Sequence, residues 1–336
     1  MYNPLSTEQV RQFTDAAQVF DTYREAEQDL RHRFAGSMSW KSRNGREYLY
    51  RIIKGREQSL GPETTETREI YKTFRAGRAA AIRRFKTLQQ RLDEMAPVNQ
   101  AMRIGRVPLD CAKILRMLDA EGYMGGEVIV VGTNALYNYE AIAGVQFGGG
   151  LVATGDVDLL LDSRRKLRLA ADNLNRKGLL GLLRRVDKSY KPVRGRRYRA
   201  ANDRGFLVDL IAPQGRNPLT SSGRLYLGSS VDDLEAAEIE GLIWLLNVPK
   251  CETVCIGEDG YPLRLSCPDP RAFAAHKLWV AQRLDREPAK KGRDQQQAEL
   301  LIQLLRERLV NYPLDAEALS AFPSEVAGLL VEAAKR

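Results

Sequence analysis

Two aspartates separated by a single residue are the part of this sequence best suited to chemistry. Asp156 and Asp158 belong to the run Thr-Gly-Asp-Val-Asp-Leu-Leu-Leu, which has the apolar character of a strand. Because residues two apart on a strand project from the same face, the carboxylates should lie side by side while Val157 enters the core. Carboxylate pairs suit hard cations such as Mg²⁺, and two ions about 4 Å apart can clamp an in-line phosphoryl displacement.

A second polar segment lies upstream, where a strand gives way to a helix. Gly132, Thr133 and Asn134 follow the apolar stretch Val-Ile-Val-Val and precede Ala-Leu-Tyr-Asn-Tyr-Glu-Ala-Ile. The N-terminus of a helix offers free backbone N–H groups to a phosphate. Glycine allows that backbone to approach closely, and the threonine hydroxyl adds a donor. These three residues are therefore predicted to bind a nucleotide.

A third carboxylate, Asp209, interrupts the apolar run Phe-Leu-Val-Asp-Leu-Ile-Ala. A buried charge without a partner is costly, so Asp209 is expected to have one. A metal shared with Asp156 and Asp158 is one candidate, and a neighbouring Arg or Lys is the other. The sequence leaves both open.

Taken in order, a Gly-Thr turn, an Asp-x-Asp strand and a later lone Asp resemble the nucleotidyltransferase superfamily typified by DNA polymerase beta. The resemblance extends to bacterial stand-alone proteins of this fold and to abortive-infection and toxin nucleotidyltransferases. It implies an α/β (α+β) nucleotidyltransferase fold with a mixed sheet, flanked by an N-terminal helical region and a mostly helical C-terminal region. It also implies that Asp156 and Asp158 hold two Mg²⁺ or Mn²⁺ ions, while Asp209 holds one and helps deprotonate the acceptor hydroxyl.

The sequence departs from that family pattern in two ways. The turn is Gly-Thr rather than Gly-Ser, and 24 positions separate Gly132 from Asp156. Five glycines between Gly144 and Gly155 indicate that the excess length is a flexible loop.

Positive charge is concentrated in one stretch beside these residues. Between Arg164 and Arg204 there are fifteen Lys or Arg and three Asp, whereas the whole chain has a net charge of +9. Cations interleaved with tyrosines can follow a phosphate backbone and stack bases. An RNA acceptor is therefore expected to contact Arg194, Arg196, Arg197 and Tyr198. The alternative is a solvated strand pair whose cations meet only the nucleoside triphosphate.

The chain is expected to have three parts: an N-terminal helical region with a β-hairpin at 1–105, a nucleotidyltransferase catalytic domain at 106–228 and a C-terminal mostly helical domain at 229–336. Ser-Thr-Glu-Gln at 6–9 is a capping box that opens a helix, and a second helix is expected from about Glu63 until Pro97 ends it. Further helices are expected near Leu167 to Lys177 and after a cap at Ser-Val-Asp-Asp, 230–233.

The C-terminal part contains one further candidate site residue. Asp269-Pro270 should open a helix carrying Lys277. By resemblance, a Lys on such a helix binds the nucleotide phosphates, and a Lys-rich turn at 290–294 packs nearby. The adjacent His276 is more typical of a structural histidine than of a base.

The cysteines and the apolar runs exclude other classes of protein. The four cysteines do not form a disulfide framework in a chain of 336 residues. Three of them flank Gly-Glu-Asp-Gly in what reads as a β-hairpin, with a spacing unlike standard zinc sites. No apolar run approaches the ~20 residues of a membrane span, so a cytoplasmic protein without a membrane partner is expected.

The sequence thus predicts an enzyme that moves a nucleoside monophosphate from an NTP to a hydroxyl, with an RNA 3′ end as the favoured acceptor. A protein or small-molecule acceptor stays open. Resemblance alone suggests a toxin–antitoxin or defence setting, in which an antitoxin would be a partner. The competing interpretation is a non-catalytic module of the same fold that binds a nucleotide, RNA or a partner protein.

Overall fold

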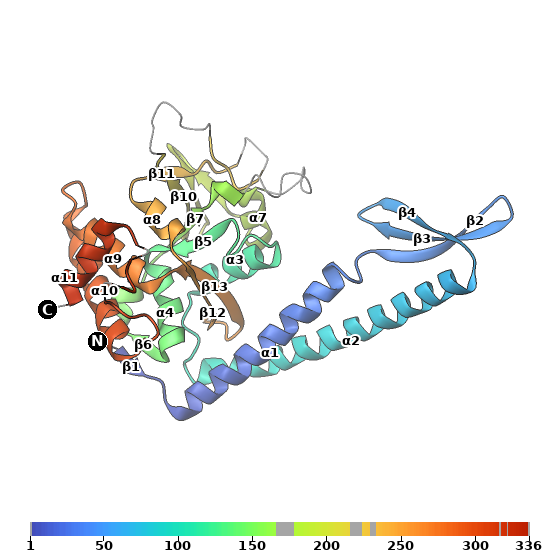
Figure 1. Ribbon diagram of the computed structural model, residues 1–336, viewed down its shortest axis with the longest axis horizontal. Coiled ribbons are helices and arrows are strands. Elements are labelled where there is room, and N and C mark those ends of the chain that lie inside the picture. Colours follow the sequence, from blue (N-terminus) through green and yellow to red (C-terminus); the bar gives the residue numbers. More distant parts are fainter. Residues whose placement is uncertain are drawn as a thin grey trace. The chain divides into compact units, whose positions relative to one another are not determined.

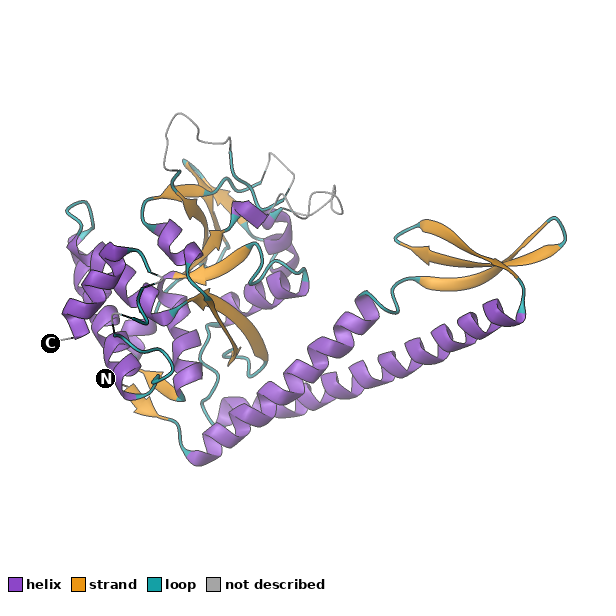
Figure 2. Ribbon diagram, viewed as in Figure 1, coloured by secondary structure: helices purple, strands orange, loops and turns teal. Residues whose placement is uncertain are grey.

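The structure is a computed structural model that describes residues 2–165, 178–215, 224–228, 233–315, 317–320 and 322–334. The chain divides into two compact units, one of residues 11–104 and the other of residues 1–10 and 105–336. Long helices and a small sheet form the first unit, and a mixed sheet surrounded by helices forms the second (Figure 1, Figure 2). No helix among the described residues is long and apolar enough to span a bilayer.

The smaller unit is built on two long helices, α1 (Thr7–Arg31) and α2 (Thr65–Ala101), which lie side by side (Figure 1). The predicted capping box opens α1, because the Ser6 N–H donates to Gln9 Oε1 at 2.9 Å and the Gln9 N–H donates to Ser6 Oγ at 3.2 Å. Tyr23 stacks on Phe85 with ring centroids 4.8 Å apart. The apolar stripe of the second helix therefore packs against the first.

The predicted end of α2 at Pro97 is wrong, since the helix continues to Ala101. Proline removes one intrahelical hydrogen bond, but the residues after Pro97 include the buried Asn99, and this burial stabilises the last turn of the helix. Asn99 is fully buried, and its Oδ1 accepts from Gln12 Nε2 of α1 at 2.8 Å.

Between the two helices the chain forms a three-stranded antiparallel sheet, one strand more than the predicted hairpin. Its order is β2-β3-β4, with strands β2 (Ser37–Arg43), β3 (Arg46–Ile53) and β4 (Arg56–Pro62). Both connections are two-residue turns, at Asn44-Gly45 and Lys54-Gly55, with positive φ at all four residues. That geometry matches the twist of paired strands.

The larger unit is organised around a mixed sheet in which β7 and β10 are parallel neighbours at the centre. Its order is β5-β7-β10-β9-β8, and β11 also pairs with β10 in parallel. The strands are β5 (Val128–Val131), β7 (Asp156–Leu161), β8 (Lys191–Val193), β9 (Arg196–Ala201), β10 (Leu207–Pro213) and β11 (Ala237–Ile239). The mixed α+β architecture predicted from the sequence is confirmed.

The glycine-rich segment between Gly144 and Gly155 is not simply the flexible loop that was predicted. It contains strand β6 (Val145–Phe147) and the short helix α5 (Gly149–Val152). β6 pairs antiparallel with β1 (Tyr2–Pro4), from the N-terminal end of the chain. The backbone hydrogen bonds of β6 are made with a strand far away in the sequence, so the local composition could not predict this strand.

Helices and one further hairpin complete this unit. The hairpin predicted around the cysteines is present as β12 (Lys250–Ile256) and β13 (Pro262–Pro268), and its thiols are buried. Asp269 caps the predicted helix by accepting from the Arg271 N–H at 2.8 Å. The helices are α3 (Leu109–Ala120), η1 (Gly132–Asn134), α4 (Ala135–Ala143), η2 (Ser163–Arg165), α7 (Leu179–Val186), α8 (Leu242–Asn247), α9 (Pro270–Gln282), α10 (Pro288–Glu307) and α11 (Ser324–Ala334).

Three local predictions in this unit have other outcomes. Residues 290–294 form no turn but part of α10, which begins at Pro288 with proline at its first position. The helix predicted near Leu167 to Lys177 and the residues 230–232 of the predicted cap lie outside the described residues. Asp233, the last residue of that cap, accepts from the N–H groups of Leu179 and Leu180 at 2.6 and 2.7 Å. It therefore caps α7, which precedes it by more than fifty residues.

Candidate active site

The three candidate aspartates meet on one face of the central sheet. Asp158 of β7 lies opposite Asp209 of the parallel strand β10, and Arg199 of β9 lies opposite Asp209 on the other side. Directly opposed residues share a face of a sheet. Asp156, two positions before Asp158, points the same way, whereas Val157 between them is fully buried. Strand pairing therefore brings three carboxylates and one guanidinium into a single cluster.

Negative charge in this cluster is not balanced. Burial, together with the charges of Asp156 and Asp209, raises the pKa of Asp158 to about 7, although Lys277 and Arg199 act in the opposite direction. Within the described ranges, no basic side chain forms an ion pair with Asp156 or Asp158. Asp156 accepts a hydrogen bond from the Thr154 hydroxyl. A cation placed here would remove the repulsion between the carboxylates.

Asp209 does have a partner, and of the two candidates the structure supplies the basic side chain. Arg199 Nε donates to Asp209 Oδ1 at 2.6 Å, and Arg199 Nη2 donates to Oδ2 at 2.5 Å. Such a two-pronged charged contact is among the stronger hydrogen-bonded pairs. Arg199 was not among the predicted site residues. One feature of the sequence could have identified it: Arg199 lies in the strand that precedes the strand of Asp209, and two such consecutive strands can pair antiparallel.

The Gly-Thr turn packs directly against this cluster. Gly132 has φ +65°, and a Cβ there would lie 2.1 Å from Asp158 Oδ2, so no other residue fits without moving the carboxylate. Thr133 lines the adjoining cavity. Asn134 is buried, and its Nδ2 donates to the Asp156 carbonyl at 2.7 Å, which fixes the start of β7.

Two helices, α9 and α10, form the opposite side of the cavity. Lys277 is 8% exposed, and its Nζ donates to Asp294 Oδ1 at 2.7 Å. Arg286 Nε donates to the other oxygen of Asp294 at 2.8 Å. Burial lowers the pKa of Lys277, and Asp294 opposes that shift. Lys277 does lie close to the segment 290–294, as predicted, because it is paired with Asp294 of that segment.

Sequence reasoning missed two further polar residues of α10. Gln297 is fully buried, and its Nε2 donates to the Leu151 carbonyl at 2.7 Å and to Thr133 Oγ1 at 3.4 Å. Arg293 donates to the Ala153 carbonyl. Among the described residues it forms no ion pair, so its charge is available to a bound anion. Only the fold reveals these contacts, because the sequence predicted a turn at 290–294 and indicated no role for Gln297.

Both sides enclose a cavity of about 470 Å³ that includes all three aspartates. That volume lies within the roughly 300–1,000 Å³ typical of small-molecule sites. Its basic side chains, apart from Arg199 beside the carboxylates, come from α9, α10 and the loop between them: Lys277, Arg283, Arg286, Lys290 and Arg293. Acidic and basic groups therefore face each other, as a metal-bound phosphate chain requires.

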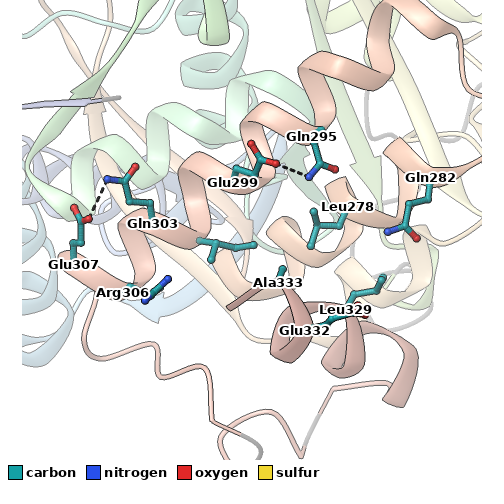
Figure 3. A pocket seen from close by; sticks show the side chains of 11 residues that line it. Leu278, Gln282, Gln295, Glu299, Gln303, Arg306, Glu307, Leu329, Glu332 and Ala333 are labelled. Atoms are coloured by element: carbon teal, nitrogen blue, oxygen red, sulfur yellow. Dashed lines mark hydrogen bonds between the residues drawn. The ribbon is translucent and has the colours of Figure 1, made fainter. Parts of the chain in front are cut away.

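A larger cavity of about 680 Å³ lies between α9, α10 and α11 (Figure 3). Its polar lining is mostly Gln and Glu, with hydrogen bonds from Gln295 to Glu299 and from Gln303 to Glu307 along α10. Arg306 is its only basic residue among those described. A polyanion would be repelled there, so chemistry rather than size identifies the candidate site.

The predicted acceptor residues lie on the β8–β9 ribbon. Arg194, Arg196 and Arg197 are exposed, and Tyr198 is partly buried beneath the Arg199 guanidinium, which is 5.7 Å from the ring centroid. Arg197 forms an exposed ion pair with Glu235 at 3.5 Å. None of these four residues lines the cavity, but Arg199, which belongs to the same ribbon, does.

The chain matches a family model described as Nucleotidyltransferase over residues 110–323, more than half of its length. No curated protein and no solved structure matches it. The matched range includes the Gly-Thr turn, all three aspartates, Lys277 and Asp294. The chain therefore belongs to this nucleotidyltransferase family, whose members transfer a nucleoside monophosphate.

Proposed function

We propose that this protein is a Mg²⁺-dependent nucleotidyltransferase that moves a nucleoside monophosphate from an NTP to the 3′ hydroxyl of an RNA, with release of pyrophosphate. The observation that carries the proposal is the pair Asp156 and Asp158. These carboxylates form no ion pair among the described residues, and Lys and Arg side chains of α9, α10 and the loop between them line the opposite side of the cavity. Like charges held together in this way favour binding of divalent cations.

The residues fit such ions in part. Within the described residues, no group of three or more His, Cys, Asp or Glu side chains is arranged to hold a metal. Asp156 and Asp158 have the required oxygen donors, and burial and the neighbouring charges of Asp156 and Asp209 raise the pKa of Asp158. Asp209 would join them once Arg199 releases one of its oxygens. Bound Mg²⁺, or Mn²⁺, would neutralise the phosphates and orient them for in-line displacement.

The residues of the chain itself bind and orient the nucleotide. The turn at Gly132 and Thr133 lies against Asp158 and presents a hydroxyl to the cavity. Arg293 and Lys277 line the helical side of the cavity. A bound phosphate would there form an ion pair with Arg293. By the resemblance, Asp209 would accept the proton of the attacking hydroxyl. Catalysis by this arrangement is mainly positioning and charge neutralisation.

An RNA acceptor is favoured by the ribbon that carries Arg199. Its exposed cations, Arg194 and Arg196, extend the basic surface beyond what a triphosphate can contact. A toxin–antitoxin or defence role, with an antitoxin as partner, rests on the resemblance of the motifs alone.

The test is transfer of label from each α-³²P-NTP in the presence of Mg²⁺, with and without total cellular RNA, and with the double variant Asp156→Asn/Asp158→Asn as control. Label on RNA that the control abolishes is the expected result. Label on protein would move the acceptor to a protein hydroxyl. No label on any acceptor would favour the alternative of a non-catalytic binding module. In such a module the ion pair between Arg199 and Asp209 would remain intact.

A further inference from the structure

The small sheet of residues 37–62 has one face packed on a helix and one face turned away from it. Trp40 contacts Tyr71 of α2 with ring centroids 5.9 Å apart, and the Arg51 guanidinium is 5.4 Å from the Phe74 ring centroid. Side chains alternate along a strand, so the neighbours of these residues point away from α2. The register places Lys41 opposite Tyr48 and Arg43 opposite Arg46 on that outer face.

The outer face and its turns are strongly basic. Residues 37–62 contain six Lys or Arg and two Glu. Four exposed cations flank the two turns, Arg43 and Arg46 at the first, Lys54 and Arg56 at the second; these four are called the tip cations. In the parts of the chain that the structure describes, none of them has an acidic partner. Lys41, by contrast, is paired with Glu57.

The spacing of the tip cations indicates a polymer rather than a small anion. The two turns lie at opposite ends of β3, which has eight residues. At about 3.4 Å per residue, this separates the two pairs by roughly 25 Å. A single triphosphate cannot contact both, whereas a strand of nucleic acid can.

Among its described residues, the same surface lacks the large exposed hydrophobic residues that a membrane-binding site would need. The large exposed hydrophobic residues of this unit, Ile70 and Val98, belong to α2 and not to the sheet. Tyr50 is 7% exposed, with Lys41 Nζ 5.6 Å and the Arg43 guanidinium 5.5 Å from its ring centroid. Because that ring is already covered by cations, phosphate contacts should dominate over base stacking.

We propose that the tip cations form a second, sequence-independent binding surface for the acceptor RNA, on the unit of residues 11–104. This inference rests on the proposed function, since it takes the acceptor to be RNA. The surface would hold the body of a strand by its phosphates, independently of the β8–β9 ribbon. Because each contact releases counterions, its binding must weaken steeply with salt.

The test measures binding without catalysis. A fluorescent single-stranded RNA of roughly 20 nucleotides, longer than one compact binding site, is titrated with the full-length protein without NTP at several salt concentrations. The variants are Arg43→Ala/Arg46→Ala, Lys54→Ala/Arg56→Ala and the quadruple combination. The matched control is Arg83→Ala/Lys86→Ala, which removes two exposed cations of α2 away from the sheet.

The expected result is a weaker affinity for both tip pairs and an unchanged affinity for the control pair. At about 0.7 per phosphate contact, the slope of log K against log salt should fall by about 1.4 for a pair and about 2.8 for the quadruple variant. Affinity should be similar for RNAs of different sequence.

Several outcomes would overturn the inference. Equal losses in the tip and control pairs would show diffuse attraction, and unchanged binding by the quadruple variant would assign the acceptor to another surface. Full displacement of RNA by polyglutamate at equal charge would indicate an acidic protein partner. Pyrophosphate release is measured in parallel, so a wild-type protein that turns over another acceptor but binds no RNA would refute this surface while leaving nucleotidyl transfer intact.

Discussion

The two walls of the cavity treat their carboxylates in opposite ways. On the helical wall, Asp294 is 3% exposed and receives hydrogen bonds from both Lys277 and Arg286. On the sheet wall, Asp156 and Asp158 lie together without an ion pair among the described residues, and burial together with the charges of Asp156 and Asp209 raises the pKa of Asp158 to about 7. Folding has therefore neutralised one group of carboxylates and left another unbalanced.

That difference separates a structural role from a functional one. A paired carboxylate holds α9 against α10 and loses little by being buried, since its partners compensate the lost hydration. An unbalanced pair costs stability and is retained only where a ligand supplies the missing charge. Asp209 lies between the two situations, because it is paired with Arg199 but belongs to the same cluster as Asp156 and Asp158.

The largest expected effect is on activity at the sheet wall. Asp158→Asn should lower the transfer rate about 10³-fold or more, because it removes several kcal/mol of charge stabilisation at the reacting phosphate. Its stability in EDTA should equal or exceed that of the wild type, since a repelled charge has been removed. Urea unfolding beside the transfer assay measures both. A clearly less stable variant would contradict the claim that this wall is unbalanced.

On the helical wall the same chemical change should act on stability. Asp294→Asn leaves the buried Lys277 uncompensated, and breaking a buried pair typically costs about 3–5 kcal/mol. Glu287→Gln is the control, because its partner Lys290 is exposed and such surface pairs contribute at most about 1 kcal/mol. Urea unfolding of the two variants compares them. Equal, small losses would show that Asp294 is not a structural carboxylate.

A third prediction asks how closely Asp158 must be placed. Gly132→Ala should reduce transfer about 10–100-fold, because the new Cβ would displace a carboxylate oxygen that lies 2.1 Å from its position. Gly144→Ala is the matched control, since Gly144 has φ +63° but no atom near its missing Cβ. Both variants should lose about 1–2 kcal/mol of stability from backbone strain. Steady-state kinetics should then separate them, and similar activities would refute the steric argument.

The sequence predicted those parts of this contrast that depend on residues close together in the chain, and not those that depend on residues far apart. Asp156 and Asp158 were recognised because a two-residue period is local, and Asp269 because a cap acts on its own helix. The pairing of Arg199 with Asp209 requires strand register, and that of Lys277 with Asp294 requires two helices to meet. Asp233 shows the limit, because it has the sequence of a local cap and serves α7 instead. Charge balance is a property of the fold, so the sequence could name the carboxylates but not separate the paired from the unpaired ones.

The smallest effect tests whether the interior of the helical wall excludes a buried charge that has no partner. His276 is packed between Trp244 and Trp279, and its Nε2 has no hydrogen-bond partner in the described structure. Burial lowers its pKa from 6.5 to about 3, with Lys277, Arg286 and Arg283 acting in the same direction and Asp294 opposing them. The folded state therefore keeps the imidazole neutral, whereas the unfolded state binds a proton below pH 6.5.

The resulting stability is complete above pH 6.5 and is lost as the pH falls toward 3. Between pH 7 and pH 5 the loss amounts to about 2 kcal/mol. His276→Phe should remove that part of the pH dependence, while His32→Gln, at an exposed histidine, should retain it. Urea unfolding of the three proteins at both pH values isolates the contribution, because the carboxylates are common to all. An unchanged pH dependence in His276→Phe would mean that the interior of this wall tolerates a buried, unpaired cation, and the contrast between the two walls would then be one of carboxylates only.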